Sequence, residues 1–309
     1  MDSFLIPSVW ETLSIFCKLS VYFGLASIAG GSLFLVAYSD GSRQTTTRIL
    51  IYSGVGAFVG FQGSIVSFLA QIGQINGAGF SGMFDLAMSQ MLIDTQLGDA
   101  TLYRLLGFGA AFLVNLWAVW ALQKVSVSPS KLFYRRLFTL NCFALMSLSL
   151  SFRLIGHVSV LSTLAQLAIA VHVVAFGFWI GILYPLTVLI NVPKVEFVQA
   201  KLRLFGQHAI FLVALLISAG GLLVLELFQS WEELFGSAYG LSVLAKIALV
   251  IGILAIAAIN KLKLVPNLTG ERGVAAFRRS LRVEAVFAVL ILSVTAYFST
   301  VIGPMSMDH

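Results

Sequence analysis

The sequence predicts an all-α, polytopic membrane protein, a bundle of eight transmembrane helices with the N- and C-termini both on the outer side of the membrane. Of its 309 residues, 59% are hydrophobic and only 10% are charged, whereas about a quarter of the residues of a soluble domain are charged. The apolar residues form continuous runs long enough to cross a bilayer, instead of the roughly ten-residue alternating segments of a β-barrel. The Lys and Arg residues gather in alternate loops, which is typical of a multi-pass helical protein.

The apolar runs define the expected helices. The fifth run is long enough that we expect it to be tilted, or broken near Pro185. The loops between the runs are too short to form a soluble domain, so residues 1–309 are expected to form a single membrane domain. The runs cover residues 12–38, 48–71, 99–123, 132–151, 159–190, 204–228, 239–262 and 281–303.

The distribution of charge gives the expected orientation. Placing the N-terminus outside puts most of the 19 Lys and Arg residues in cytoplasmic loops, as the positive-inside rule requires. The opposite loops are acidic, with Asp85, Asp94 and Asp99 in one and Glu232 and Glu233 in another. The net charge of +6 is therefore attributed to topology. No run of basic residues resembles a nucleic-acid-binding patch.

The fifth run carries a histidine, His172, in its interior. A titratable group inside the hydrocarbon is costly and by default indicates a functional site. At 100° per residue, Trp179 returns to the face of His172, while Gly177 and Gly181 form a GxxxG pair on the opposite face that suits close helix packing. The alternative is a structural histidine that hydrogen-bonds to a neighbouring backbone group.

The segments around this histidine resemble those of a known family. They are "RLIGH" from Arg153, "FWIGILYPL" after His172, "YGLSVLAKIALVIGILAIAAINKLKLVP" from Tyr239, and "LRVEAVFAVLILSVTAYFSTVIGP" from Leu281, which includes Glu284. In this order and spacing they are similar to the core of the copper resistance protein D (CopD) family. The likeness covers residues 152–304, the fifth to eighth helices, whereas residues 1–151 resemble the family only in general character.

Two features depart from the family pattern. Gly206, in "RLFGQH", stands where a serine is expected, and these 309 residues include no copper-binding CopC-like domain. The resemblance implies copper transport across a bacterial inner membrane, as uptake from periplasm to cytoplasm, in copper homeostasis or resistance. It also implies a separate periplasmic CopC-like chaperone as a partner. The sequence does not decide whether the protein forms a homo-oligomer. No enzymatic activity is expected, because the sequence contains neither a nucleophile–base pair nor a phosphate-binding loop.

Copper, as Cu(I) or Cu(II), is bound by imidazole, thiolate and thioether groups. The side chains of these types fall at different expected depths, which suits a relay of weakly held ions, because one tight site would trap the ion. In this interpretation Trp179 closes the pocket of His172, and Glu284 forms a pair or an exit site with the innermost histidine. The expected ligands, from outside to inside, are Met305, Met307 and His309 of the tail (residues 305–309), His157, Cys142 and Met146, His172, and His208.

Two interpretations compete with parts of this one. Met83, Met88 and Met91 lie in the acidic outer loop, where a helix resting on the membrane explains the last two of them better than metal binding does. A haem-binding redox protein would use His172 and His208 as axial ligands on neighbouring helices, although their expected depths differ. Whether the outer methionines bind metal, and whether the two histidines hold haem, depends on where the fold places these side chains.

Overall fold

The computed structural model describes residues 6–124 and 128–302, and these residues form helices and their connections without any β-strand. An all-α fold is therefore confirmed. Short 3₁₀ helices cover Gly79–Phe84 and His157–Val160, and five-residue π-helical turns, Asn260–Leu264 and Phe298–Ile302, continue α10 and α11. The α-helices are α1 Val9–Ala37, α2 Arg43–Asn76, α3 Leu86–Ile93, α4 Gln96–Lys124, α5 Lys131–Ser151, α6 Thr163–Gly181, α7 Leu183–Leu189, α8 Val195–Leu227, α9 Trp231–Gly236, α10 Ala238–Ile259 and α11 Gly270–Tyr297.

Seven helical segments of the described chain are long and apolar enough to cross a membrane: α1, α2, α4, α6 with α7, α8, α10 and α11. The protein is therefore a polytopic helical membrane protein. The expected span at 132–151 is also helical, as α5, but it is not among the seven. Its first turns carry Lys131, Arg135 and Arg136, which lower its apolar character.

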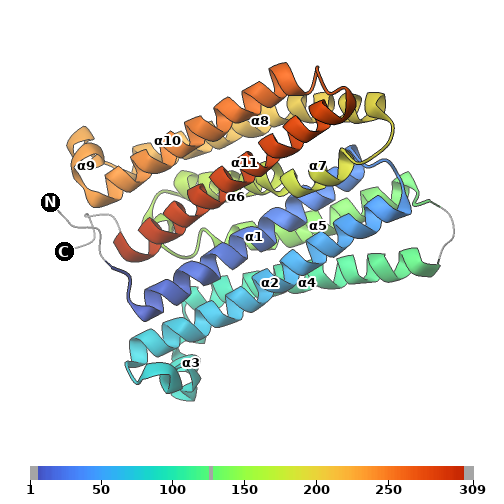
Figure 1. Ribbon diagram of the computed structural model, residues 1–309. Helices are drawn as coiled ribbons and strands as arrows, with labels where there is room; N and C mark the ends of the chain where they lie inside the picture. The colour runs from blue at the N-terminus through green and yellow to red at the C-terminus, as the bar shows by residue number, and fades with distance from the viewer. Residues whose placement is uncertain (1–5, 125–127, 303–309) are drawn as a thin grey trace.

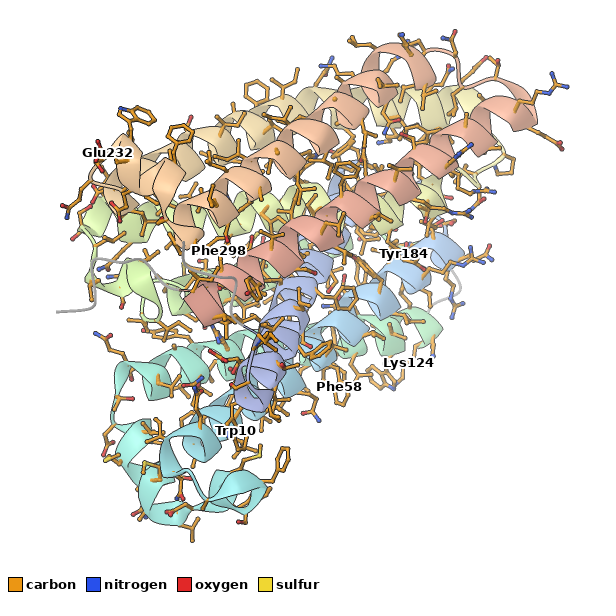
Figure 2. All side chains as sticks on the ribbon, turned by 60° about the vertical axis from the view of Figure 1, so that its left-hand side comes forward. Trp10, Phe58, Lys124, Tyr184, Glu232 and Phe298 are labelled. Carbon is orange, nitrogen blue, oxygen red and sulfur yellow. The ribbon has the colours of Figure 1, made fainter. Side chains whose placement is uncertain are left out.

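The long helices run side by side (Figure 1), with α1 in contact with α2, α5, α6 and α11. The described chain begins and ends at the same end of the bundle, where α3 and α9 also lie, and the connections α1–α2, α7–α8 and α10–α11 lie at the other end. Figure 2 shows Glu232 and Lys124 at these opposite ends. The acidic and basic connections are thus separated in space as the sequence indicates.

The outer surface of the bundle is apolar. Side chains such as Phe58 point away from the helices in Figure 2, and Phe58 is 50% exposed. Leu113, Trp117 and Leu225 are also more than half exposed. An apolar surface of this extent is incompatible with water and is what a lipid-facing surface requires.

The break expected near Pro185 is present: α6 ends at Gly181 and α7 begins at Leu183. The close packing expected of Gly177 and Gly181 is also present, and the partner is α1. A Cβ on Gly177 would lie 2.5 Å from Leu25 Cδ2, and a Cβ on Gly181 would collide with the backbone of Ala26. Only glycine allows α6 to approach α1 this closely.

Candidate metal path between the helices

His172 lies on the side of α6 that faces α8, opposite the glycine face. Its Nδ1 is 3.2 Å from the backbone carbonyl oxygen of Leu216. A carbonyl oxygen can only accept a hydrogen bond, so Nδ1 carries the proton that is donated. In the neutral ring, Nε2 then keeps its lone pair. Backbone-anchored imidazoles with one free nitrogen are the form in which histidine binds metals.

A glycine of α8 makes room for this ring. A Cβ on Gly220 would lie 3.2 Å from His172 Cε1, whereas a Cβ on the adjacent Gly221 would meet nothing within 4 Å. The imidazole therefore packs directly against the backbone of α8. Both contacts, with Gly220 and with the Leu216 carbonyl, come from α8 and involve the same edge of the ring.

Toward the acidic end, the seam between α6 and α8 is lined by small side chains. Ala165 and Ala168 of α6 pack against Ala219 of α8 in one buried cluster. At the end of the seam, Ser162 Oγ donates a hydrogen bond of 2.9 Å to the exposed carboxylate of Glu226. A negative charge thus lies where the seam opens, and it attracts cations.

Toward the basic end of α6 and α8, residues of α6, α8, α10 and α11 line a cavity of about 400 Å³. Ile217, next to the residue that holds His172, lines one part of it, and Glu284 lines another. Trp179 also lines this cavity. Gly206 lines this cavity as well, and a Cβ added to it would lie 3.5 Å from Lys261 Cγ.

Glu284 is buried in this cavity wall and is paired with an amide. Asn260 Nδ2 donates a 2.6 Å hydrogen bond to Glu284 Oε1, while Asn260 Oδ1 is buried and has no partner in the described part of the chain. Glu284 is 5% exposed. The pair places one acceptor-rich polar group in an otherwise apolar wall, and such groups inside a membrane domain mark ion pathways.

His208 faces a different space. Its Nδ1 lies 2.6 Å from the hydroxyl of Tyr38 on α1. It lines a second cavity, of about 310 Å³, with Phe138 of α5 and Phe178 of α6. When Nδ1 donates to the Tyr38 oxygen, Nε2 is left free, as in His172. The pair with Glu284 is not formed, because each residue has another partner.

His172 and His208 also do not converge on one site. His172 is level with Leu216–Gly220, roughly 12–18 Å along α8 from His208 by the rise of 1.5 Å per residue. Two axial haem ligands must reach opposite faces of one iron atom, whereas His172 packs against Leu216 and His208 lines a separate cavity with Phe138 and Phe178. Haem therefore gains no support from the positions of these histidines.

The other expected ligands are less informative. Cys142 is half-buried on α5, and Met146 is 56% exposed on the outside of the same helix, so its thioether does not enter the bundle. Met305, Met307 and His309 lie outside the described residues, as does the side chain of His157. Within the described ranges, no three His, Cys, Asp or Glu side chains group into a metal-binding cluster.

The methionine-containing outer segment forms the expected helix, α3. It is capped by Asp85, whose carboxylate accepts a 3.0 Å hydrogen bond from Met88 N. Met83 packs against Gly73 of α2, while Met91 is 57% exposed. The three thioethers are thus differently placed, which favours packing over a shared metal site.

Sequence reasoning missed Tyr38 and Asn260 as partners of His208 and Glu284. Asn260 could have been found, because it is a polar residue at the end of an apolar run of α10 and such residues need partners inside a membrane domain. Tyr38 gives no such signal, because tyrosine is common at membrane interfaces.

Comparison with known proteins agrees with the resemblance found in the sequence. No curated protein and no solved structure matches the chain. The model of the family described as "Copper resistance protein D" matches residues 199–298. The model described as "Copper resistance protein D-like, N-terminal domain" matches residues 9–165, so the likeness extends to the first helices. Because that model alone covers half of the sequence, the chain belongs to the copper resistance protein D family.

Proposed function

We propose that this protein transports copper inward across a bacterial inner membrane, and that the ion passes along the seam between α6 and α8. The family membership supports a copper-related membrane protein. The transport step and its direction rest on the argument below.

The observation that carries the proposal is Nε2 of His172, which has no hydrogen-bond partner among residues 6–124 and 128–302. Its Nδ1 hydrogen is held by the Leu216 carbonyl, and a neutral imidazole oriented in this way offers a lone pair to Cu(I) or Cu(II). A histidine that served packing alone would not need an unused nitrogen inside the hydrocarbon, where an unsatisfied polar group is costly.

The seam supplies further steps on both sides of His172. Copper enters past the Glu226 carboxylate, binds His172, and continues through the 400 Å³ cavity to the Glu284–Asn260 pair. Lys246 of α10 acts electrostatically on His172. The positive charge of the lysine therefore opposes tight binding of a copper ion at this histidine. Weak binding is what conduction requires. His208, with its own cavity, is a second inner site.

The outer groups would deliver the ion. In this proposal, His157 and the tail with Met305, Met307 and His309 receive copper from a separate periplasmic CopC-like chaperone. Cys142 lies on α5, away from the seam, and is at most an accessory ligand. The protein itself performs no chemical conversion and serves copper homeostasis or resistance.

We further propose eight transmembrane segments, with α5 as the eighth and both termini in the periplasm. The described chain starts and finishes at one end of the bundle, which requires an even number of crossings. The basic connections at the other end then face the cytoplasm, as the positive-inside rule predicts.

The test is copper uptake into proteoliposomes that enclose a fluorescent Cu(I) chelator. Wild-type protein is compared with His172→Ala, and with His172→Gln, whose amide can still donate to the Leu216 carbonyl. We expect uptake with the wild type and little with either variant, provided that both melt like the wild type. Uptake by His172→Ala at the wild-type rate would refute the assignment.

A further inference from the structure

Two cations lie inside the acidic, outer half of the bundle, on helices away from the copper seam. Lys18 is roughly 14 Å along α1 from its outer end, and Arg104 roughly 12 Å along α4, by the rise of 1.5 Å per residue. Arg104 is 8% exposed. The two charges are close enough to repel each other.

Neither cation has a carboxylate partner in residues 6–124 or 128–302. Lys18 Nζ donates to the carbonyl oxygen and hydroxyl of Ser299, at 2.8 and 3.0 Å. Arg104 uses Nε for Ser151 Oγ, at 3.2 Å, and its two terminal nitrogens have no hydrogen-bond acceptor there. Unpaired buried cations are costly, and two that repel each other are costlier still.

Aromatic rings pack beside the two cations. Tyr22, one turn after Lys18 on α1, stacks on Phe152 at 6.0 Å, and the Phe152 ring centroid lies 5.4 Å from Arg104 Cζ. Four elements, α1, α4, the end of α5 and the turn after α11, thus contribute groups around the two cations.

Among the described residues, the donors of Lys18 and Arg104 outnumber the acceptors that contact them. The missing component is an acceptor with negative charge.

We propose that Lys18 and Arg104 bind a small inorganic monoanion of the chloride class in the outer half of the bundle. The ion is small because Phe152 already packs 5.4 Å from Arg104 Cζ and the Ser299 oxygens lie within 3.0 Å of Lys18 Nζ. One negative charge between the two cations replaces their repulsion by two attractions. The bound anion also lowers the positive potential at the end of the bundle where copper enters.

The experiment measures thermal unfolding of the purified protein in sodium gluconate and in sodium chloride at equal ionic strength. We expect a saturable rise of the Tm with chloride, on the order of 5 °C at a concentration a hundredfold above Kd. Arg104→Met should lose this dependence. Lys124→Met, which removes an exposed cation stacked on Trp120 at the other end of the bundle, should retain it.

If Arg104→Met fails to fold, a direct measurement of chloride binding still tests the proposal. Radioactive chloride should bind stoichiometrically to the wild-type protein and not to Lys18→Met. Equal Tm values in the two salts, together with no bound chloride, would overturn the proposal. If phosphate or anionic lipid raises the Tm and chloride does not, the ligand is a phosphate group and the proposal of a small monoanion is wrong.

Discussion

The contact between α1 and α6 sets the position of His172, and replacing Gly181 by alanine tests it. The added Cβ would lie 2.5 Å from the carbonyl carbon of Ala26 and 3.0 Å from the nitrogen of Gly30. Both are backbone atoms, which no side-chain rotation can move, so α6 must shift away from α1.

The cost follows from the structure. Overpacking of this kind costs about 1–3 kcal/mol. The shift also lengthens the 3.0 Å hydrogen bond from the Tyr52 hydroxyl to the Gly181 carbonyl, which contributes about 1 kcal/mol. Alanine offsets about 0.5–1 kcal/mol of this cost, because its helix propensity is higher than that of glycine. We therefore expect Gly181→Ala to lower the free energy of unfolding by about 2–3 kcal/mol.

Two other glycines provide graded controls. The closest atom to the Cβ of Gly177→Ala would be the flexible end of Leu25, at 2.5 Å, with Ala29 Cβ next at 3.2 Å, so its cost should be smaller. Gly221→Ala meets nothing within 4 Å and should be neutral or slightly stabilising. The assay is unfolding in mixed micelles by denaturing detergent. If Gly181→Ala is as stable as Gly221→Ala, the packing account is wrong.

Three further changes test the site and its surroundings. Gly220→Ala should reduce copper uptake without the stability loss of Gly181→Ala, because its Cβ would press on His172 at 3.2 Å; unchanged transport would show that this contact does not matter. Tyr38→Phe should weaken copper binding about tenfold, since it removes the hydrogen bond that orients His208; equal copper retention in a chelator titration would contradict this. The backbone N–H of Met88 holds the pKa of the Asp85 carboxyl below its ordinary value, so the cap stabilises α3 at all pH values above the unfolded-state pKa and is lost as the pH falls through the lower folded-state pKa. The protection factors of the α3 amides, which are hydrogen-exchange rates corrected for the intrinsic pH dependence, should therefore fall in acid in the wild type but be low at every pH in Asp85→Ala; identical pH dependence would exclude the cap.

Apolar run length predicted where the helices are but not where they end. The run from 204 predicted the start of that helix, whereas α8 begins at Val195, and α11 begins at Gly270 instead of 281. The added turns carry polar and charged side chains such as Lys201, which donates to the carbonyl of Ala37. Such turns project beyond the apolar layer, so hydropathy does not report them.

The two faces of α6 were predictable because helical periodicity separates Gly177 and Gly181 from His172. The partners of those faces were not, because they come from α1 and α8, far along the chain. The same holds for Trp179, whose ring lines a cavity that no local pattern predicts. Local pattern thus indicates which residues matter, whereas the chemistry of each depends on a distant element.

The measurement that tests the central claim most directly is metal analysis with a visible spectrum on protein purified without oxygen, wild type beside His172→Ala. If His172 holds copper through its free Nε2, the wild type retains copper, the variant has lost it, and neither shows a Soret band. Equal copper in both proteins, or a Soret band that disappears in the variant, would contradict the account.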